Sequence, residues 1–178
     1  MRCSHRKPAV AVRWAGAGVL MITSSLVMAG PAQTSATRDQ IAKALQVITD
    51  GVQNGDSAAT MARKLYAKNI LIIGEGEAHA AQGIDEAAQD TQAFWDSLGP
   101  DGAKSCKFQM VEPSVQSRDT YTSFLLLNCK ANPPALTKAV TVRLLYSWKK
   151  LPAGWRVVLE TWGIGSIDKS SGVTDVTR

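Results

Sequence analysis

The first half of the chain repeats its apolar residues every three or four positions, a spacing that predicts amphipathic helices. One helix is expected to begin at Thr37, whose hydroxyl forms a capping box with Gln40, and to end at Gly55. A second helix is expected to follow Asp56 as its N-cap and to end near Tyr66. Their apolar faces consist of Ile41, Ala44, Leu45, Ile48 and Val52, and of Ala58, Met61, Ala62 and Leu65.

A short strand pair and a third helix are predicted next. Residues 69–73 are rich in isoleucine and predict a strand, which Gly74–Gly76 interrupts. Residues 77–82 then form a weak second strand or a loop. The third helix follows Gly83, and its buried face consists of Ile84, Ala87, Ala88, Thr91, Trp95 and Leu98.

The second half of the chain alternates apolar and polar residues, which predicts four strands over residues 105–115, 119–130, 139–150 and 154–165. In the first hairpin, the register that gathers the apolar side chains on one face places Cys106 opposite Cys129 and Phe108 opposite Leu127. Directly opposed cysteines are close enough for a disulfide, although two small buried thiols would fit the same pattern.

In the second hairpin, the most apolar register pairs Trp148 with Trp155, Tyr146 with Val157 and Leu144 with Leu159 on the core side. The other face then carries Arg143 opposite Glu160, so a cross-strand ion pair is expected there. Leu145, Val158 and Trp162 form an apolar patch on the same outer face. Because soluble monomers seldom expose such a patch, we expect a homodimer through this face of the sheet.

The start of the chain has the order of an export signal. Basic residues without an acidic neighbour come first, and an apolar run from Trp14 to Ala29 and a polar stretch follow. The run is short and polar for a membrane-spanning helix, although an uncleaved N-terminal anchor is the alternative. We therefore expect a signal peptide over residues 1–29 with cleavage after Ala29, a linker over residues 30–36, and a periplasmic or secreted protein. Its contact with a membrane is expected only during export.

Removal of this leader nearly balances the charge. Four of the 20 basic residues lie in the leader, which leaves 16 basic and 15 acidic residues in a chain of 149. No basic stripe remains, so nucleic acid is not an expected partner. The length suits one domain, expected over residues 37–167, with a flexible tail over residues 168–178. His79 is the only histidine left, so no zinc site and no cofactor are expected, and an oxidising compartment favours the disulfide.

Three phrases of the sequence resemble the nuclear transport factor 2-like superfamily, and within it the SnoaL-like and ketosteroid isomerase-like branch. They are Leu65–Gly74, Gln82–Ala87 and Gly154–Val158, the last of which follows a strand that ends at Ser147–Lys149. The resemblance covers roughly residues 37–167. It implies an α+β fold in which a cone-shaped, curved antiparallel sheet wraps around the N-terminal helices, as in a cystatin-like roll, and leaves a pocket at its open end.

If the protein is an enzyme of this kind, it needs a carboxylate or histidine as proton carrier and a donor such as tyrosine. Glu75, Glu77 and His79 lie near the place where isomerase-type relatives carry their base, although a solvated turn would explain them equally. Glu112 shares the parity of the inward-facing residues of its strand, although the neighbouring Pro113 also fits a strand edge in water. The expected pocket-lining residues are Tyr66, Trp95, Tyr121, Ser123 and Tyr146.

The resemblance allows two functions, of which the first is the one we expect and the second is its alternative. One is an exported protein that binds a small, largely apolar molecule in the cone, with or without cofactor-free acid–base catalysis of the isomerase, cyclase or dehydratase type. The other is a non-catalytic association module whose cone is filled by its own side chains. An open cavity above roughly 300 Å³ with a polar group in it would favour the first.

Overall fold

A computed structural model of the chain describes residues 31–165 and 173–175. The predicted signal peptide and its cleavage site after Ala29 lie outside these residues. The helices are α1 (Pro31–Gln53), α2 (Ala58–Leu65), α3 (Gly83–Leu98) and the 3₁₀ turn η1 (Gly102–Ser105). The strands are β1 (Tyr66–Gly74), β2 (Ala81–Gln82), β3 (Lys107–Gln116), β4 (Thr120–Cys129), β5 (Val140–Leu151), β6 (Gly154–Ile164) and β7 (Val173–Asp175).

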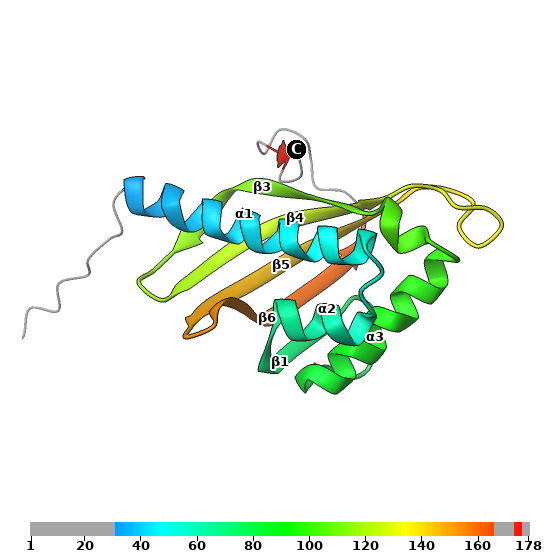
Figure 1. The fold of residues 1–178 in the computed structure, drawn as a ribbon, viewed down its shortest axis with the longest axis horizontal. Helices are drawn as coiled ribbons and strands as arrows, with labels where there is room; N and C mark the ends of the chain where they lie inside the picture. The colour runs from blue at the N-terminus through cyan, green and yellow to red at the C-terminus, as the bar shows by residue number, and fades with distance from the viewer. Residues whose placement is uncertain (1–30, 166–172, 176–178) are drawn as a thin grey trace, which may run out of the picture.

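The described strands form one sheet in the order β2-β1-β6-β5-β4-β3-β7. Strands β3 to β6 are an antiparallel meander, as the sequence predicted, and β1 adds to β6 in parallel. The three α-helices cover one face of this curved sheet (Figure 1). The architecture is therefore the predicted α+β roll of helices against a curved sheet.

The hydrophobic core lies between the helices and the inner face of the sheet. Phe108, Tyr146 and Val157 are at most 8 % exposed, and Leu127 packs against the same cluster. The helices contribute residues such as Ile41 and Leu45, which have no exposed surface. The predicted inward faces of the helices and of the first three meander strands are therefore confirmed. No helix in the described ranges is both long enough and apolar enough to cross a membrane.

Helix α1 begins earlier than the capping box predicted. It starts at Pro31, a residue type favoured in the first turn of a helix, so the linker expected over residues 30–36 is helical from residue 31 onward. Thr37 lies inside the helix and is 8 % exposed. Its hydroxyl accepts a hydrogen bond from Nε2 of Gln116 at 3.0 Å, so it links α1 to the end of β3 rather than capping the helix.

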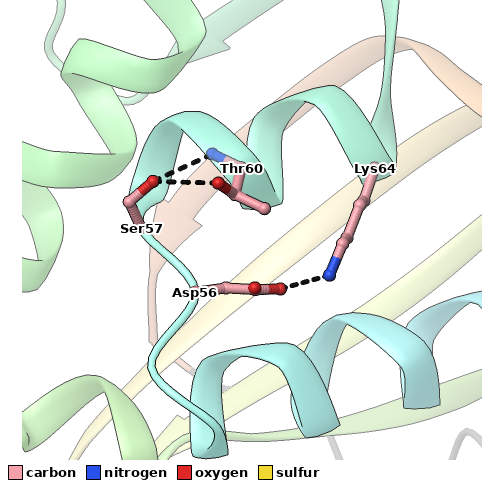
Figure 2. A network of polar contacts seen from close by, with 4 residues as sticks. All are labelled: Asp56, Ser57, Thr60 and Lys64. Atoms are coloured by element: carbon pink, nitrogen blue, oxygen red, sulfur yellow. Dashed lines mark hydrogen bonds and ion pairs between the residues drawn. The ribbon is translucent and has the colours of Figure 1, made fainter.

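Helix α2 is capped one residue later than predicted. Oγ of Ser57 accepts a hydrogen bond from the backbone N–H of Thr60 at 3.2 Å, which makes Ser57 the N-cap. Asp56, the expected cap, instead forms an ion pair with Lys64 in the last turn of the same helix (Figure 2). Aspartate and serine are about equally good N-caps, which is why the sequence did not separate the two positions.

The first hairpin keeps the predicted register over most of its length. Phe108 pairs with Leu127. Two residues further from the turn on each strand, the cysteines form the Cys106–Cys129 disulfide that the register suggested. The register shifts between Val111 and Val115, so beyond this point Val115 pairs with Thr122 and Gln116 with Tyr121. On the other side of β3, strand β7 pairs with residues 109–111, so this part of the predicted flexible tail is a strand.

The second hairpin departs from its predicted register in two ways. From the turn onward the strands are offset by two residues, so Trp148 pairs with Val157 and not with Trp155 as predicted, and further along β6 contains a β-bulge. Near the turn, Trp148 pairs with Val157, whereas one step further Ser147 pairs with Leu159. Val158 is therefore the extra residue. Side chains alternate between the two faces of a strand, so one extra residue sends every later side chain to the face opposite the predicted one.

This bulge overturns the predicted environment of the last half of β6. Glu160 pairs with Tyr146 and not with Arg143, so the expected ion pair on the outer face is wrong. Trp162 pairs with Leu144 and packs against the core cluster, so its assignment to an outer dimer face is wrong as well. Glu160 and Trp162, which the sequence placed on the outer face of the sheet, thus belong to the inside of the cone.

Candidate functional site

A cavity of about 570 Å³ lies between the helices and the inner face of the sheet. Its walls come from α1, α2, α3 and η1 on one side and from β1, β3, β4, β5 and β6 on the other. Most lining side chains are aliphatic or aromatic, among them Phe94, Trp95 and Phe108. The cone is therefore hollow, and this volume is in the range of small-molecule sites.

Glu160 is the most buried charged residue of the cavity wall. The bulge at Val158 turns it inward, and only 6 % of its surface is exposed. The phenol of Tyr66, at the start of β1, donates a hydrogen bond of 2.6 Å to Oε2 of Glu160. Tyr146, which pairs with Glu160 across β5 and β6, lies beside the same carboxylate and helps to lower its pKa. Two tyrosines thus hold one carboxylate at the side of an apolar cavity.

Burial raises the pKa of Glu160 from 4.5 to about 7. Desolvation is the main cause, and the nearby carboxylates of Asp90 and Glu77 add to it, while the hydrogen bonds from Tyr66 and Tyr146 oppose it. Burial and the Glu160 charge raise the pKa of both tyrosines well above 10, so the phenols stay protonated and act as donors. Near neutral pH, Glu160 is therefore a carboxyl that can either accept or release a proton.

Two further carboxylates line the cavity from other elements. Asp90 comes from α3, and desolvation followed by the charges of Glu77 and Glu86 raises its pKa. Glu77 follows β1, and its Oε2 accepts a hydrogen bond from the backbone N–H of Gly74 at 2.9 Å. The acidic side of the cavity is thus built from β6, α3 and the loop after β1.

Gly74 makes the close packing of this corner possible. A Cβ at this position would lie 2.5 Å from the ring of Trp162 and 2.4 Å from the carboxyl of Glu77. Atoms cannot approach so closely, so any larger residue would displace at least one of these two lining side chains. The glycine that the sequence indicated as a strand breaker is therefore also a packing requirement.

Glu75 lies at the rim, where it is tied to the sheet. Its Oε2 accepts hydrogen bonds from the backbone N–H of Ile164 at 2.9 Å and from Nη2 of Arg143 at 3.2 Å. Arg143 therefore finds its carboxylate partner after β1, instead of in Glu160 as predicted. Each charge of this ion pair is offset by its partner. Because both side chains are about half exposed, the pair is also hydrated.

The structure brings some of the predicted site residues together and separates others. Tyr66, Trp95, Tyr146, Glu75 and Glu77 line the cavity. His79 is exposed and does not line it, because residues 75–80 form turns instead of an extended segment that would align the three predicted acid–base residues. Glu112 lies in β3 at the register shift, and its side chain lies outside the described part of the chain.

Tyr121 and Ser123 do not line the cavity. Both are fully buried, Tyr121 donates a hydrogen bond of 2.7 Å to Ser114, and Ser123 accepts one of 2.9 Å from Nε1 of Trp148. They belong to the packed part of the cone, beyond the end of the hollow. The prediction that Tyr121 and Ser123 line the cavity is wrong, because packed side chains of β4 fill this end of the roll.

Sequence reasoning missed Glu160, Asp90 and Trp162 as cavity residues. One indication was available: the predicted register exposed Trp162 while it buried Thr161. A single bulge before these residues corrects both placements, and bulges are common next to functional sites. Asp90 offered no comparable indication, because its helix face is mixed in polarity.

The Cys106–Cys129 disulfide lies at one end of the cavity, and the described residues around the cavity form no metal site. Cys106 lines the cavity at the end near η1, where its bond to Cys129 fixes the start of β3 to the end of β4. Within the described ranges, no three side chains of the His, Cys, Asp or Glu type are gathered closely enough to hold a metal ion. The chemistry on offer is therefore that of carboxyls and phenols in an apolar space.

No family model and no curated protein matches the chain in sequence. Solved structures do resemble it. An NTF2-like protein with a cystatin-like fold from Novosphingobium aromaticivorans has a TM-score of 0.56 at 16 % identity, covering 81 % of this chain and 96 % of its own. An NTF2-like protein of unknown function from Pseudomonas putida has a TM-score of 0.55 at 14 % identity, covering 81 % and 97 %.

A third similar structure is a putative calcium/calmodulin-dependent protein kinase II association domain from Xanthomonas campestris. Its TM-score is 0.51 at 11 % identity, and the match covers 80 % of this chain and 93 % of that one. The three proteins share the architecture while their printed descriptions differ, so fold does not select a function here. The chain has the NTF2-like fold.

Proposed function

We propose that the protein binds a small, largely apolar molecule in the cavity of its cone. The observation that carries this proposal is the volume of about 570 Å³ with Glu160 buried in its wall. An association module with a filled cone would not need this space. The SnoaL-like and ketosteroid isomerase-like branch remains the most suitable comparison for such a site.

The proposal can be tested with N-phenyl-1-naphthylamine, a neutral dye that fluoresces in apolar sites. Ala93 on α3 lines the cavity but is exposed, so tryptophan there should obstruct the opening without entering the core. Ala36 on α1 is also exposed and does not line the cavity, so it serves as the matched control. We expect A93W to weaken dye binding at least tenfold and A36W to leave it unchanged. Equal binding by both variants would place the dye elsewhere and contradict the proposal.

Proton transfer on the bound molecule is the second candidate function, favoured by the pKa of about 7 at Glu160. A general base works best when its pKa is close to the working pH. The base-promoted ring opening of 5-nitrobenzisoxazole tests this capacity. The carboxylate would remove the ring C–H proton as the N–O bond breaks, leaving a cyano-nitrophenolate. We expect a rate that rises through about pH 7 and is lost in E160Q. A rate unaffected by E160Q would exclude Glu160 as the base.

Export to the periplasm or the outside of the cell is part of the same proposal. The basic and apolar leader supports it, and the Cys106–Cys129 disulfide is typical of proteins in oxidising compartments. Mass spectrometry of the protein from an exporting host tests it, with cleavage after Ala29 as the expected result. An intact leader on the exported protein would favour the alternative of an N-terminal anchor.

A homodimer through the outer face of the sheet remains a proposal, in which Leu145 keeps its predicted place and Trp162 does not. A row of paired residues crosses this face through Phe124, Leu145, Thr161 and Ile73, and two of its members, Phe124 and Ile73, are 43 % and 45 % exposed. Sedimentation of the wild type and F124E tests it. A dimer that F124E dissociates supports the proposal, and a wild-type monomer at all concentrations contradicts it.

A further inference from the structure

The side chains that line the cavity are unbalanced in charge. Four carboxylates reach it, those of Glu75, Glu77, Asp90 and Glu160, and no lysine, arginine or histidine is among the lining residues in the described ranges. Arg143 lies at the rim, where it forms an ion pair with Glu75. The other three carboxylates take part in none of the ion pairs formed within the described residues.

The surroundings of Glu160 would suit a positive group. Its neighbours are aromatic: Tyr66 donates to it, Tyr146 pairs with it across the sheet, and Trp162 lies two residues further on the same face of β6. The faces of tyrosine and tryptophan rings attract cations, most strongly when the cation is removed from water. A carboxylate in an apolar cavity with tyrosine and tryptophan side chains nearby can hold an organic ammonium group.

The size of the space indicates what else the ligand carries. About 570 Å³ of largely apolar cavity accommodates a hydrocarbon body, while a metal ion would use only the carboxylates. Those carboxylates are not grouped closely enough in the described part of the chain to form a metal site. An anionic ligand would meet three carboxylates without a cation to offset them.

We infer that the ligand of this cavity is an apolar organic cation, an amine whose ammonium group meets Glu160 while its hydrocarbon body lies against the aromatic and aliphatic walls. This inference rests on the proposed function and names the chemical class of its ligand. The ammonium donates hydrogen bonds to the carboxylate, and Tyr66 and Tyr146 fix the orientation of that carboxylate. Asp90 and Glu77 strengthen the attraction from α3 and from the loop after β1.

Three probes with one carbon skeleton test the charge preference directly. They are 3-phenylpropylamine, 3-phenylpropan-1-ol and 3-phenylpropanoate, compared at pH 8 by displacement of N-phenyl-1-naphthylamine and by calorimetry. We expect the amine to bind at least about tenfold more tightly than the alcohol, since a desolvated cation gains both the ion pair and the ring faces. The carboxylate should bind least. This ranking needs no variant, so it does not depend on how a substitution affects folding.

The variants then assign the preference to one residue. E160Q keeps the shape of the side chain and removes its charge, so it should remove most of the difference between amine and alcohol and leave only the part that Asp90 and Glu77 supply. Asp39 is an exposed carboxylate on α1 outside the cavity, and D39N, which removes the same charge there, should keep the full preference.

The outcomes separate the two proposals. An alcohol that binds as tightly as the amine, or an amine preference that is as large in E160Q as in the wild type, would overturn the cation inference while the cavity still binds small molecules. Failure of all three probes and of the dye to bind would overturn the proposed function and this inference together.

Discussion

Replacing Glu160 by glutamine should change how the stability of the protein depends on pH. Burial raises the pKa of Glu160 in the folded state from 4.5 to about 7, despite the hydrogen bonds from Tyr66 and Tyr146. In the unfolded chain the carboxyl is in water and returns to its ordinary pKa. Between these two pKa values the folded state therefore binds a proton that the unfolded state has released.

The size of the effect follows from the separation of the two pKa values. Each pH unit corresponds to about 1.4 kcal/mol, so the full separation amounts to about 3 kcal/mol. Because the proton favours the folded state, this contribution is complete below the unfolded pKa and is lost as pH rises through about 7. E160Q has no titrating group at this site. Its free energy of unfolding should therefore rise by about 3 kcal/mol relative to the wild type between about pH 4 and about pH 8.

Urea unfolding followed by tryptophan fluorescence at a series of pH values measures this difference. All other carboxyls are common to both proteins, so the pH dependence of the difference reports Glu160 together with its electrostatic coupling to Asp90 and Glu77. D39N removes an exposed carboxyl from α1 and should follow the wild type within error. A difference between E160Q and wild type that stays constant from pH 4 to pH 8 would refute the buried environment argued for Glu160.

Three further predictions concern its surroundings. Y66F removes a donor that stabilises the charged carboxylate, so it should raise the pKa of Glu160 further, and a lowered value in the same unfolding titration would contradict the hydrogen bond. G74A should displace the ring of Trp162 and weaken dye binding, whereas unchanged binding would mean that this corner has room. Serine at both cysteines of the disulfide, 23 residues apart, should lower the free energy of unfolding by about 3 kcal/mol in urea, and no loss would indicate that the bond does not constrain the chain.

The elements of the meander could be predicted from the sequence because alternation and turn residues are local properties. Strands β3 to β6 begin and end within about two residues of the expected positions. The disulfide followed from the same reasoning, since the register that places Phe108 opposite Leu127 also places Cys106 opposite Cys129. The starts of the helices were predicted less accurately. Asp56 and Ser57 can both act as N-caps, and the environment of Thr37 is set by tertiary contacts.

The candidate site was predicted poorly for a specific physical reason. Residues 157–162 read Val-Val-Leu-Glu-Thr-Trp, and either face of this segment is apolar enough to pack against a core. A bulge at Val158 depends on pairing with both β5 and β1, which the local sequence does not specify. The bulge decided whether Glu160 met Arg143 outside or Tyr146 inside. A one-residue shift thus separated a surface ion pair from a buried carboxyl in a cavity.

The most direct test of the account is the ionisation of Glu160 itself, measured by NMR in protein labelled with ¹³C at the glutamate side-chain carboxyls. E160Q identifies the resonance that belongs to this residue. The account predicts that this carbon titrates with a pKa of about 7 and that binding of 3-phenylpropylamine lowers the value, because the cation stabilises the carboxylate. A pKa near 4.5 that does not respond to the amine would contradict the inward orientation of Glu160 and the site built around it.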